Sequence, residues 1–393
     1  MRSNLLSVSV FLLLILSHCS KIQKGNINSE FQSLFIDAKA QSPSRFIRKV
    51  TSESIDSLIM KIHENAGTGT FADTLTDTTG TQYLIGYRTP EIIKKDTSYP
   101  LVIYLHGGTG TEINTKGEHA FEMLSPMQDS MEIFLVSPSA NRNARWWNAA
   151  GISRILQTLR FMTFHYPIDT SKVFLAGVSD GATGCWAAAN CIAGPFAGFF
   201  AISGYGGILP STGMQLYPEN IMQRPIYSVN AGNDRLYSLD MVNNFLDYLS
   251  GKGVEVIRKS YPDEQHGFDY REKEFGTLCA YIRSWSRPSF QGFRWQFVQG
   301  VPNIPPNILQ CVTNSSEKVS LRGYYKADTL SLQATGISSL ILNGIAPDQN
   351  CFVSVNNSPV KHCKQTEPPF STHLQIARQT GFPFFNKSSF ISI

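Results

Sequence analysis

The chain has 393 residues, of which 42% are hydrophobic and 16% are charged, a composition typical of a folded protein rather than a disordered one. Its 34 lysines and arginines exceed its 30 acidic residues by only four, and no run of five like charges occurs, so nucleic-acid binding through a basic patch is not indicated. The length favours two or three domains, one of them an α/β domain of about 200–250 residues.

The N-terminal segment has the pattern of an export signal. Arg2 precedes the apolar run Val8–Leu16 (VSVFLLLIL), which is too short to cross a bilayer. The run ends in Ser17-His18-Cys19, which resembles the lipobox of bacterial lipoproteins, where the cysteine is acylated. We expect residues 1–18 to be a signal peptide and a lipid on Cys19 to attach the protein to the bacterial cell envelope. Ordinary cleavage near Ser17 to Ser20, giving a secreted or periplasmic protein, is the alternative.

Strand-like and helix-like segments alternate through most of the chain. Residues 19–66 are predicted to form a polar tether followed by a helix over Ser52–Ala66. The next two segments, Thr70–Thr76 and Thr81–Arg88, are predicted to form an opening hairpin. Over residues 67–286, further strands are predicted at 101–105, 133–137, 172–178, 199–203, 225–230 and 255–261, and helices at 152–165, 180–191, 240–250 and 272–286. This alternation predicts an α/β fold with a mostly parallel sheet flanked by helices.

The C-terminal segment, residues 287–393, has a different composition. It is rich in Pro, Ser, Thr and Asn, with short apolar runs at 329–332, 338–342 and 351–355, and we expect a small β-rich domain. Cys351 and Cys363 either pair across a hairpin or remain two thiols. Because the sequence contains no CxxC spacing, a structural zinc site is not expected.

A GxSxG motif marks a candidate nucleophile. The segment Lys172–Gly181 (KVFLAGVSDG) places Ser179 between a buried strand and an alanine-rich helix, which is the context that a nucleophile elbow requires. Small residues, Gly177 and Gly181, flank the serine, and we expect that the helix and a neighbouring strand crowd the turn at these two positions. The amide of Asp180 would lie at a helix N-terminus, where N–H groups lack partners and favour negative charge.

A second glycine turn follows the predicted strand 101–105. The sequence LVIYLHGGTG ends that strand in His106, and glycines let a backbone N–H turn toward a ligand. We expect the amide of Gly108 or Thr109 to be the second donor of an oxyanion hole. His106 is expected to hold this loop rather than to act as a base.

Two later strand ends supply a candidate acid and a candidate base. Asp234 ends the segment PIYSVNAGND and is placed to orient a histidine, with Asp240 as the alternative. His266 lies in the loop YPDEQHGFDY after the next strand, and it is the histidine that best fits a general base. The tryptophans Trp146 and Trp147 are predicted either to form a substrate wall or to pack in the core.

The chain order Ser179, Asp234, His266 is that of the α/β-hydrolase triad. Residues 67–286 resemble secreted esterases of the polyhydroxybutyrate depolymerase and feruloyl esterase type. Four motifs carry this resemblance: the LHGG strand end, the GVSDG elbow, the AGNDRLY turn and the QHGF loop. The resemblance implies that Ser179 attacks an ester carbonyl, His266 transfers the proton and Asp234 orients His266. It also implies that the amides of Asp180 and Gly108 bind the oxyanion, with no metal or cofactor.

Three functions are compatible with these residues. The first is an exported serine carboxylic ester hydrolase acting on a small-molecule or polymeric ester. The second is a serine peptidase of the same fold, which would share the order of the triad. The third is a non-catalytic surface binding protein, which the presence of all three triad positions disfavours.

Overall fold

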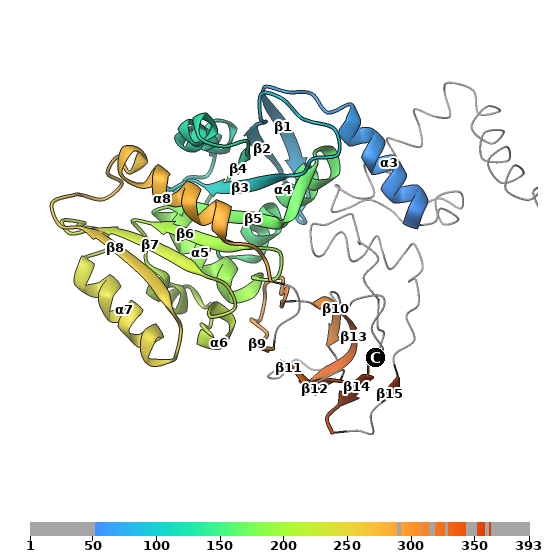
Figure 1. Ribbon diagram of the computed structural model, residues 1–393. Helices are drawn as coiled ribbons and strands as arrows, with labels where there is room; N and C mark the ends of the chain where they lie inside the picture. The colour runs from blue at the N-terminus through green and yellow to red at the C-terminus, as the bar shows by residue number, and fades with distance from the viewer. Residues whose placement is uncertain are drawn as a thin grey trace, which may run out of the picture.

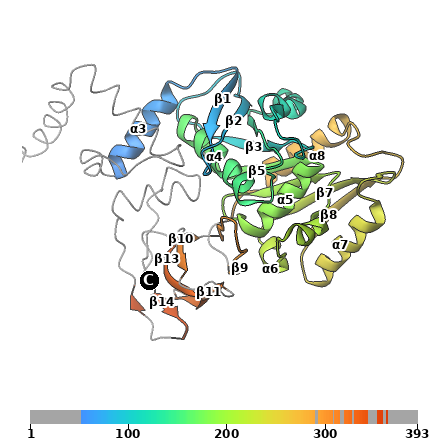
Figure 2. The same cartoon turned by 180° about the vertical axis from the view of Figure 1, so that it is seen from behind.

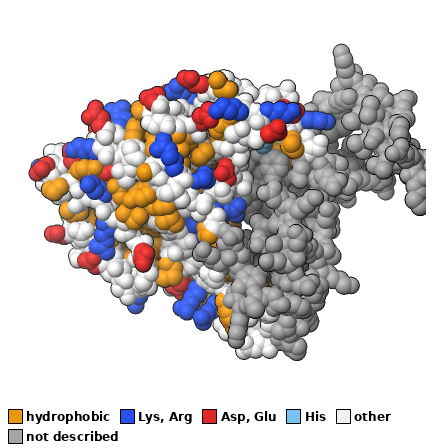
Figure 3. Space-filling model, viewed as in Figure 1, with side chains coloured by type: hydrophobic (Ala, Val, Ile, Leu, Met, Phe, Trp, Pro, Cys, Tyr) orange, Lys and Arg blue, Asp and Glu red, His pale blue; other side chains and the backbone are white. Residues whose placement is uncertain are grey.

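The computed structural model describes residues 52–288, 292–306, 308–313, 319–326, 329–342, 352–357 and 361–362. The predicted signal peptide and Cys19 lie outside these residues, as do Cys351 and Cys363, so the lipid and disulfide predictions stay predictions. Among the described residues, no helix is both long and apolar enough to span a membrane. On the face shown in Figure 3, lysine and arginine side chains are interspersed with acidic ones.

An eight-stranded sheet with the order β1-β2-β4-β3-β5-β6-β7-β8 organises the larger part of the structure (Figure 1). The first two strands pair in antiparallel fashion, and β2 is antiparallel to β4, whereas the pairs from β4 to β8 are all parallel. The strands are β1 (Thr70–Thr76), β2 (Gln82–Arg88), β3 (Tyr99–Leu105), β4 (Phe134–Pro138), β5 (Ile168–Val178), β6 (Gly198–Ile202), β7 (Ile226–Ala231) and β8 (Val256–Tyr261). The predicted mostly parallel sheet is confirmed.

Helices cover both faces of this sheet, because its central strands are apolar on both sides. One face packs against α4, α5 and α7, which Figure 2 shows in front, and the other packs against η3 and α8, with α8 in front in Figure 1. The helices are α3 (Ser52–Glu64), α4 (Ala149–His165), α5 (Asp180–Cys191), α6 (Pro218–Ile221), α7 (Leu239–Gly251) and α8 (Arg271–Ser284), with 3₁₀ turns η2 (Lys116–Glu118), η3 (Ala120–Asp129) and η4 (Gly206–Thr212).

The C-terminal strands form separate small sheets. A five-stranded sheet has the order β15-β14-β12-β11-β9, and β10 pairs with β13. The strands are β9 (Phe293–Gln296), β10 (Ile308–Thr313), β11 (Ser320–Lys326), β12 (Thr329–Thr335), β13 (Ile337–Leu342), β14 (Phe352–Val355) and β15 (Lys361–His362). This agrees with the expected β-rich region, although the strands β9, β10, β11 and β15 were not predicted.

The five-stranded sheet packs on the larger sheet's helical layer. Its buried side chains Trp295, Leu321 and Leu330 belong to the same hydrophobic cluster as α4, α5 and α7. The side-chain amide of Asn220 in α6 donates a hydrogen bond to the carbonyl oxygen of Gln296 in β9 at 2.7 Å, and the Gln296 amide donates back to Asn220 at 2.8 Å. Shared burial and paired hydrogen bonds therefore hold β9 against α6.

Candidate active site

Ser179 lies in a strained turn between β5 and α5. Its backbone angles are φ 57° and ψ −120°, a conformation that L-residues rarely adopt. A Cβ at Gly181 would lie 1.9 Å from the carbonyl oxygen of Leu105 in β3, and one at Gly177 would lie 2.4 Å from Gly181. The predicted crowding of both glycines is therefore confirmed, and it explains why positions 177 and 181 have no room for a side chain.

His266 and Asp234 lie beside this turn. The Oγ of Ser179 is 2.9 Å from Nε2 of His266, and Nδ1 of His266 is 2.7 Å from Oδ2 of Asp234. Because the Asp234 carboxylate accepts hydrogen bonds, Nδ1 carries the imidazole proton and Nε2 is free to accept the Ser179 hydroxyl proton. The imidazole is thereby held in the tautomer that a general base needs.

The Asp234 carboxylate is fixed by the turn that follows β7. Its other oxygen, Oδ1, accepts hydrogen bonds from the amides of Leu236 at 2.8 Å and Tyr237 at 2.9 Å. The Asp234 side chain is 2% exposed and the His266 side chain 22% exposed, so the carboxylate is shielded while the imidazole faces the solvent side. Asp240, the alternative acid, is exposed on the first turn of α7, and none of its contacts within the described residues reaches His266.

The three residues meet because of the sheet. Ser179, Asp234 and His266 follow β5, β7 and β8, which run parallel, so their carboxyl ends open at one edge. Ligands bind at this edge in open α/β sheets. Residues separated by 55 and 32 positions in sequence are thus brought within hydrogen-bonding distance.

The His106-Gly107-Gly108 turn lies against the Ser179 elbow. A Cβ at Gly107 would lie 3.0 Å from Cβ of Ser179, and Gly108 has a left-handed φ of 70°. The carbonyl oxygen of Gly107 accepts a hydrogen bond from Nδ1 of His106 at 2.9 Å and one from the ammonium of Lys116 at 3.4 Å. Because N–H and C=O point in opposite directions across a trans peptide, the Gly108 amide points away from both groups.

Two candidate oxyanion donors remain available in this arrangement. The amides of Gly108 and Asp180 donate no hydrogen bond to another described residue. The amide of Thr109, in contrast, donates to Oδ2 of Asp180 at 2.7 Å, and the Thr109 hydroxyl donates to the same oxygen at 2.8 Å. The prediction of Thr109 as an oxyanion donor is therefore wrong, because its N–H group is already engaged.

His106 supports the loop, as expected. Its Nε2 accepts a hydrogen bond from the amide of Ala140 at 3.0 Å, and burial lowers the pKa of His106 to about 4. A backbone N–H can only donate, so the ring is neutral and Nδ1 carries the proton that reaches Gly107. The histidine thus connects the loop to the end of β4 and is not available as a base.

The two tryptophans have different environments. Trp146 is completely buried, and its indole N–H donates to the carbonyl oxygen of His106 at 2.9 Å. The prediction of a substrate wall is wrong for Trp146, since a side chain without exposed surface cannot line an open site. Trp147 is 9% exposed, and the guanidinium of Arg145 lies 5.6 Å from its ring centroid. A substrate contact at Trp147 stays a prediction.

Sequence reasoning missed Lys116 and two tyrosines near the site. A Cβ at Gly108 would lie 2.9 Å from Nζ of Lys116, which places a positive charge beside the glycine turn. The ring of Tyr237 lies 5.7 Å from that of His266, and Tyr205 lies 6.1 Å from Tyr237. Lys116 belongs to no motif, so only the tertiary structure could identify it.

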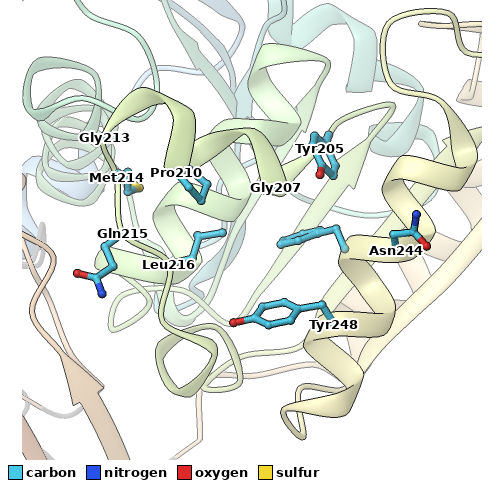
Figure 4. A pocket seen from close by; sticks show the side chains of 10 residues that line it. Tyr205, Gly207, Pro210, Gly213, Met214, Gln215, Leu216, Asn244 and Tyr248 are labelled. Carbon is cyan, nitrogen blue, oxygen red and sulfur yellow. The ribbon is translucent and has the colours of Figure 1, made fainter.

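A pocket of about 680 Å³ extends from Tyr205 along α7. It is lined by uncharged residues, and in Figure 4 they lie on two sides, with Met214 and Leu216 facing Asn244 and Tyr248. Tyr205, which lines this pocket, is next to Tyr237, and the ring of Tyr237 is in turn next to His266. Within the described residues, no cluster of histidine, cysteine and acidic side chains could hold a metal ion.

The sheet order and the Ser179–His266–Asp234 arrangement define the α/β-hydrolase fold, and the chain has this fold. No family model and no curated protein matches the sequence. Among solved structures, the chain is similar to a thermostable esterase (21% identity, TM-score 0.45, 58% of this chain and 64% of that one). It is also similar to a ferulic acid esterase (16% identity, TM-score 0.45, 55% of this chain and 98% of that one). A third similar structure is a Mycobacterium tuberculosis puromycin-hydrolyzing peptidase (14% identity, TM-score 0.45, 56% of this chain and 40% of that one).

The chain spans less than two thirds of the thermostable esterase and of the peptidase. At these identities and TM-scores, the similarities carry no conclusion about what this protein acts on.

Proposed function

We propose that this protein is a serine hydrolase that cleaves carboxylic esters through an acyl-enzyme intermediate on Ser179. The observation that supports the proposal is the pair of hydrogen bonds through the imidazole, 2.9 Å from Ser179 to His266 and 2.7 Å from His266 to Asp234. A serine hydroxyl is a weak nucleophile by itself and is activated by an adjacent, correctly oriented base.

In the proposed acylation step, Oγ of Ser179 attacks the ester carbonyl carbon while Nε2 of His266 takes the hydroxyl proton. The carbonyl oxygen becomes an oxyanion that accepts hydrogen bonds from the amides of Gly108 and Asp180, each worth about 3–4 kcal/mol in the transition state. The buried carboxylate of Asp234 stabilises the imidazolium form of His266. The intermediate then collapses, the C–O bond to the alcohol breaks, and His266 protonates the leaving alkoxide.

Water completes the proposed cycle. His266 removes a proton from a water molecule, which attacks the acyl carbon, and the second tetrahedral intermediate uses the same two amides. Collapse releases the carboxylic acid and returns the proton to Oγ of Ser179. Every proton is carried by His266, so neither a metal nor a cofactor enters these steps.

The test combines covalent labelling with turnover. The parent protein should react with a fluorophosphonate probe and hydrolyse p-nitrophenyl acyl esters, whereas Ser179→Ala should not be labelled. Asp234→Asn should lower kcat by about 10⁴-fold, because an amide at this position favours the wrong imidazole tautomer. Asp240→Asn is the matched control and should keep the parent rate.

Two results would contradict the proposal. Labelling that persists in Ser179→Ala would remove this serine from the nucleophile role. Turnover of aminoacyl p-nitroanilides with little turnover of p-nitrophenyl esters would replace the esterase by a peptidase.

The proposed hydrolase is further expected to be exported and held at the bacterial cell envelope through a lipid on Cys19. Incorporation of radiolabelled palmitate by the full chain in a bacterial host tests this, with Cys19→Ser as the control. Equal incorporation by both proteins, or none, would leave the secreted or periplasmic form as the better interpretation.

A further inference from the structure

A second cleft, of about 580 Å³, lies between the helical layer and the five-stranded sheet. One wall is built from α6 and the end of α7, and the other from β9 and β11. Its lining includes three cations, Lys252, Arg294 and Arg322, and two tyrosines, Tyr248 and Tyr324. The hydrolysis proposed above uses none of these side chains.

The two arginines face each other across a strand pair. Arg294 in β9 and Arg322 in β11 are register partners in antiparallel strands, so both side chains lie on the same face, and both are exposed. Like charges directly opposite each other destabilise a strand pair. On the other face, Phe293, Trp295 and Leu321 are buried, so the sheet directs its two arginines together into the cleft.

The positive charge of the cleft is balanced only in part, since three cations and one acidic residue line it. Within the described part of the chain, Lys252, Arg294 and Arg322 form no ion pair. Glu219 is the one acidic residue that lines the cleft. Two adjacent guanidinium groups present planar forks that match carboxylate and phosphate oxygens. The geometry thus favours a ligand that carries anionic oxygen groups.

The aromatic residues add a second kind of contact. Tyr248 is 51% exposed and Tyr324 42% exposed, and the ammonium of Lys252 lies 5.9 Å from the ring centroid of Tyr248. The Tyr324 ring and the other face of Tyr248 are available for stacking on flat apolar surfaces such as those of sugar rings. Tyr248 also lines the uncharged pocket of Figure 4, so this side chain borders both cavities. That pocket begins at Tyr205, which is connected to His266 through Tyr237.

We propose that the cleft binds uronic-acid residues of an acidic polysaccharide, with Arg294 and Arg322 holding carboxylates and Tyr248 and Tyr324 stacking on sugar rings. In this proposal the polymer extends from the cleft past Tyr248, Tyr205 and Tyr237 to Ser179. The substrate class that follows, an acylated acidic polysaccharide, rests on the proposed function, whereas binding in the cleft does not. A concave, aromatic-lined cleft suits a flexible glycan better than a flat membrane.

The experiment separates binding from hydrolysis. Ser179→Ala in the full chain is titrated with polygalacturonate by isothermal calorimetry, with unsubstituted xylan as the neutral polymer. We expect polygalacturonate to bind with an affinity that falls as salt is added, and xylan to bind more weakly. Adding Arg294→Gln and Arg322→Gln should lower the polygalacturonate affinity by about tenfold or more. Arg142→Gln, an exposed arginine elsewhere, is the matched control and should bind like Ser179→Ala.

Several outcomes would overturn the proposal. One is no binding of polygalacturonate at low salt, and another is equal binding with and without the two arginines. A third is binding to phosphatidylglycerol vesicles that depends on the same arginines, without polygalacturonate binding, which would assign the cleft to a membrane surface. If binding is found but p-nitrophenyl esters are not hydrolysed by the parent, the cleft stands and the proposed catalytic function fails.

With an active protein, the specificity ratio tests the path to Ser179. The ratio of kcat/KM for acetylated polygalacturonate to that for p-nitrophenyl acetate should fall about tenfold in the double arginine variant, mostly through KM of the polymer. An unchanged ratio would show that the cleft does not bind the substrate that is hydrolysed at Ser179.

Discussion

The carboxylate of Asp180 accepts hydrogen bonds from both the amide and the hydroxyl of Thr109, at 2.7 and 2.8 Å. The residue directly after the candidate nucleophile is therefore tied to the loop that supplies the second oxyanion donor. This connection keeps the Ser179 turn and the Gly108 turn in a fixed relation, and Asp180 acts through its side chain as a positioning residue.

Removal of this carboxylate should impair turnover more than substrate binding. We predict that Asp180→Ala lowers kcat for p-nitrophenyl acetate by about 10- to 100-fold with little change in KM, because a loosened Gly108 turn misplaces an oxyanion donor. Asp180→Asn keeps an oxygen acceptor and should recover most of the rate. Steady-state kinetics of both variants test this, and a parent-like kcat for Asp180→Ala would contradict it.

Replacement of a glycine by alanine should be costly in the crowded elbow but not at an open position of α8. Gly181→Ala would place a methyl group 1.9 Å from the Leu105 carbonyl oxygen and should lower the free energy of unfolding by about 3 kcal/mol or more. Gly276 in α8 has no atom within 4 Å of a built Cβ, so Gly276→Ala should raise stability by about 0.5–1 kcal/mol. Urea unfolding measures both, and equal effects would be inconsistent with the described turn.

A buried ion pair connects the opening hairpin to α4. Nε and Nη2 of Arg154 donate to Oδ2 of Asp77 at 3.0 and 2.8 Å, and both side chains are at most 2% exposed. Asp77→Asn should lower the free energy of unfolding at pH 7 by about 3–5 kcal/mol, because it leaves a buried guanidinium without its counterion. The control is Asp269→Asn, which breaks an exposed ion pair with Arg271 and should have the same urea midpoint of unfolding as the parent.

The Asp77 effect should depend on pH. Burial by itself raises the pKa of Asp77, but hydrogen bonds from Thr79 and Arg154 outweigh it and bring the pKa below its usual value. A carboxylate with a lowered pKa contributes stability above its unfolded pKa and loses it as the pH falls through the folded pKa. The difference in free energy of unfolding between the parent and Asp77→Asn should therefore become smaller below about pH 4.

Buried histidines predict a second pH dependence, at higher pH. Burial lowers the pKa values of His63, His106 and His165 to about 4. The unfolded chain binds these protons near pH 6.5, whereas the folded chain does not, so stability should fall as the pH drops from about 6.5 to 4.

His165 offers the cleanest test of this dependence. Its ring packs on Phe161 and Phe164, so His165→Phe should fill the space and remove about one proton from the slope of unfolding free energy against pH. Above pH 7 the slopes of parent and variant should coincide. An unchanged slope between pH 4 and 6 would show that His165 does not contribute.

The core strands were predictable because a strand buried on both faces reads as a continuous apolar run. The run 101–105 lies within β3, and 172–178 lies within β5, each close to its predicted bounds. The tail was harder, since β9 and β11 alternate buried with exposed residues and lack such a run. Their pairing with each other depends on contacts across 24 residues or more of chain, which local sequence does not encode.

For the site, the sequence by itself determined the residue types and their order. The GVSDG elbow, the glycine turn after His106 and the strand-end positions of Asp234 and His266 were all readable, because each depends on local backbone requirements. The tertiary structure alone decided which peptide N–H groups stay free. The orientation of the Gly108 peptide depends on His106 and Lys116, and Asp180 engages Thr109. Such choices arise from hydrogen bonds between distant segments, and a linear motif does not record them.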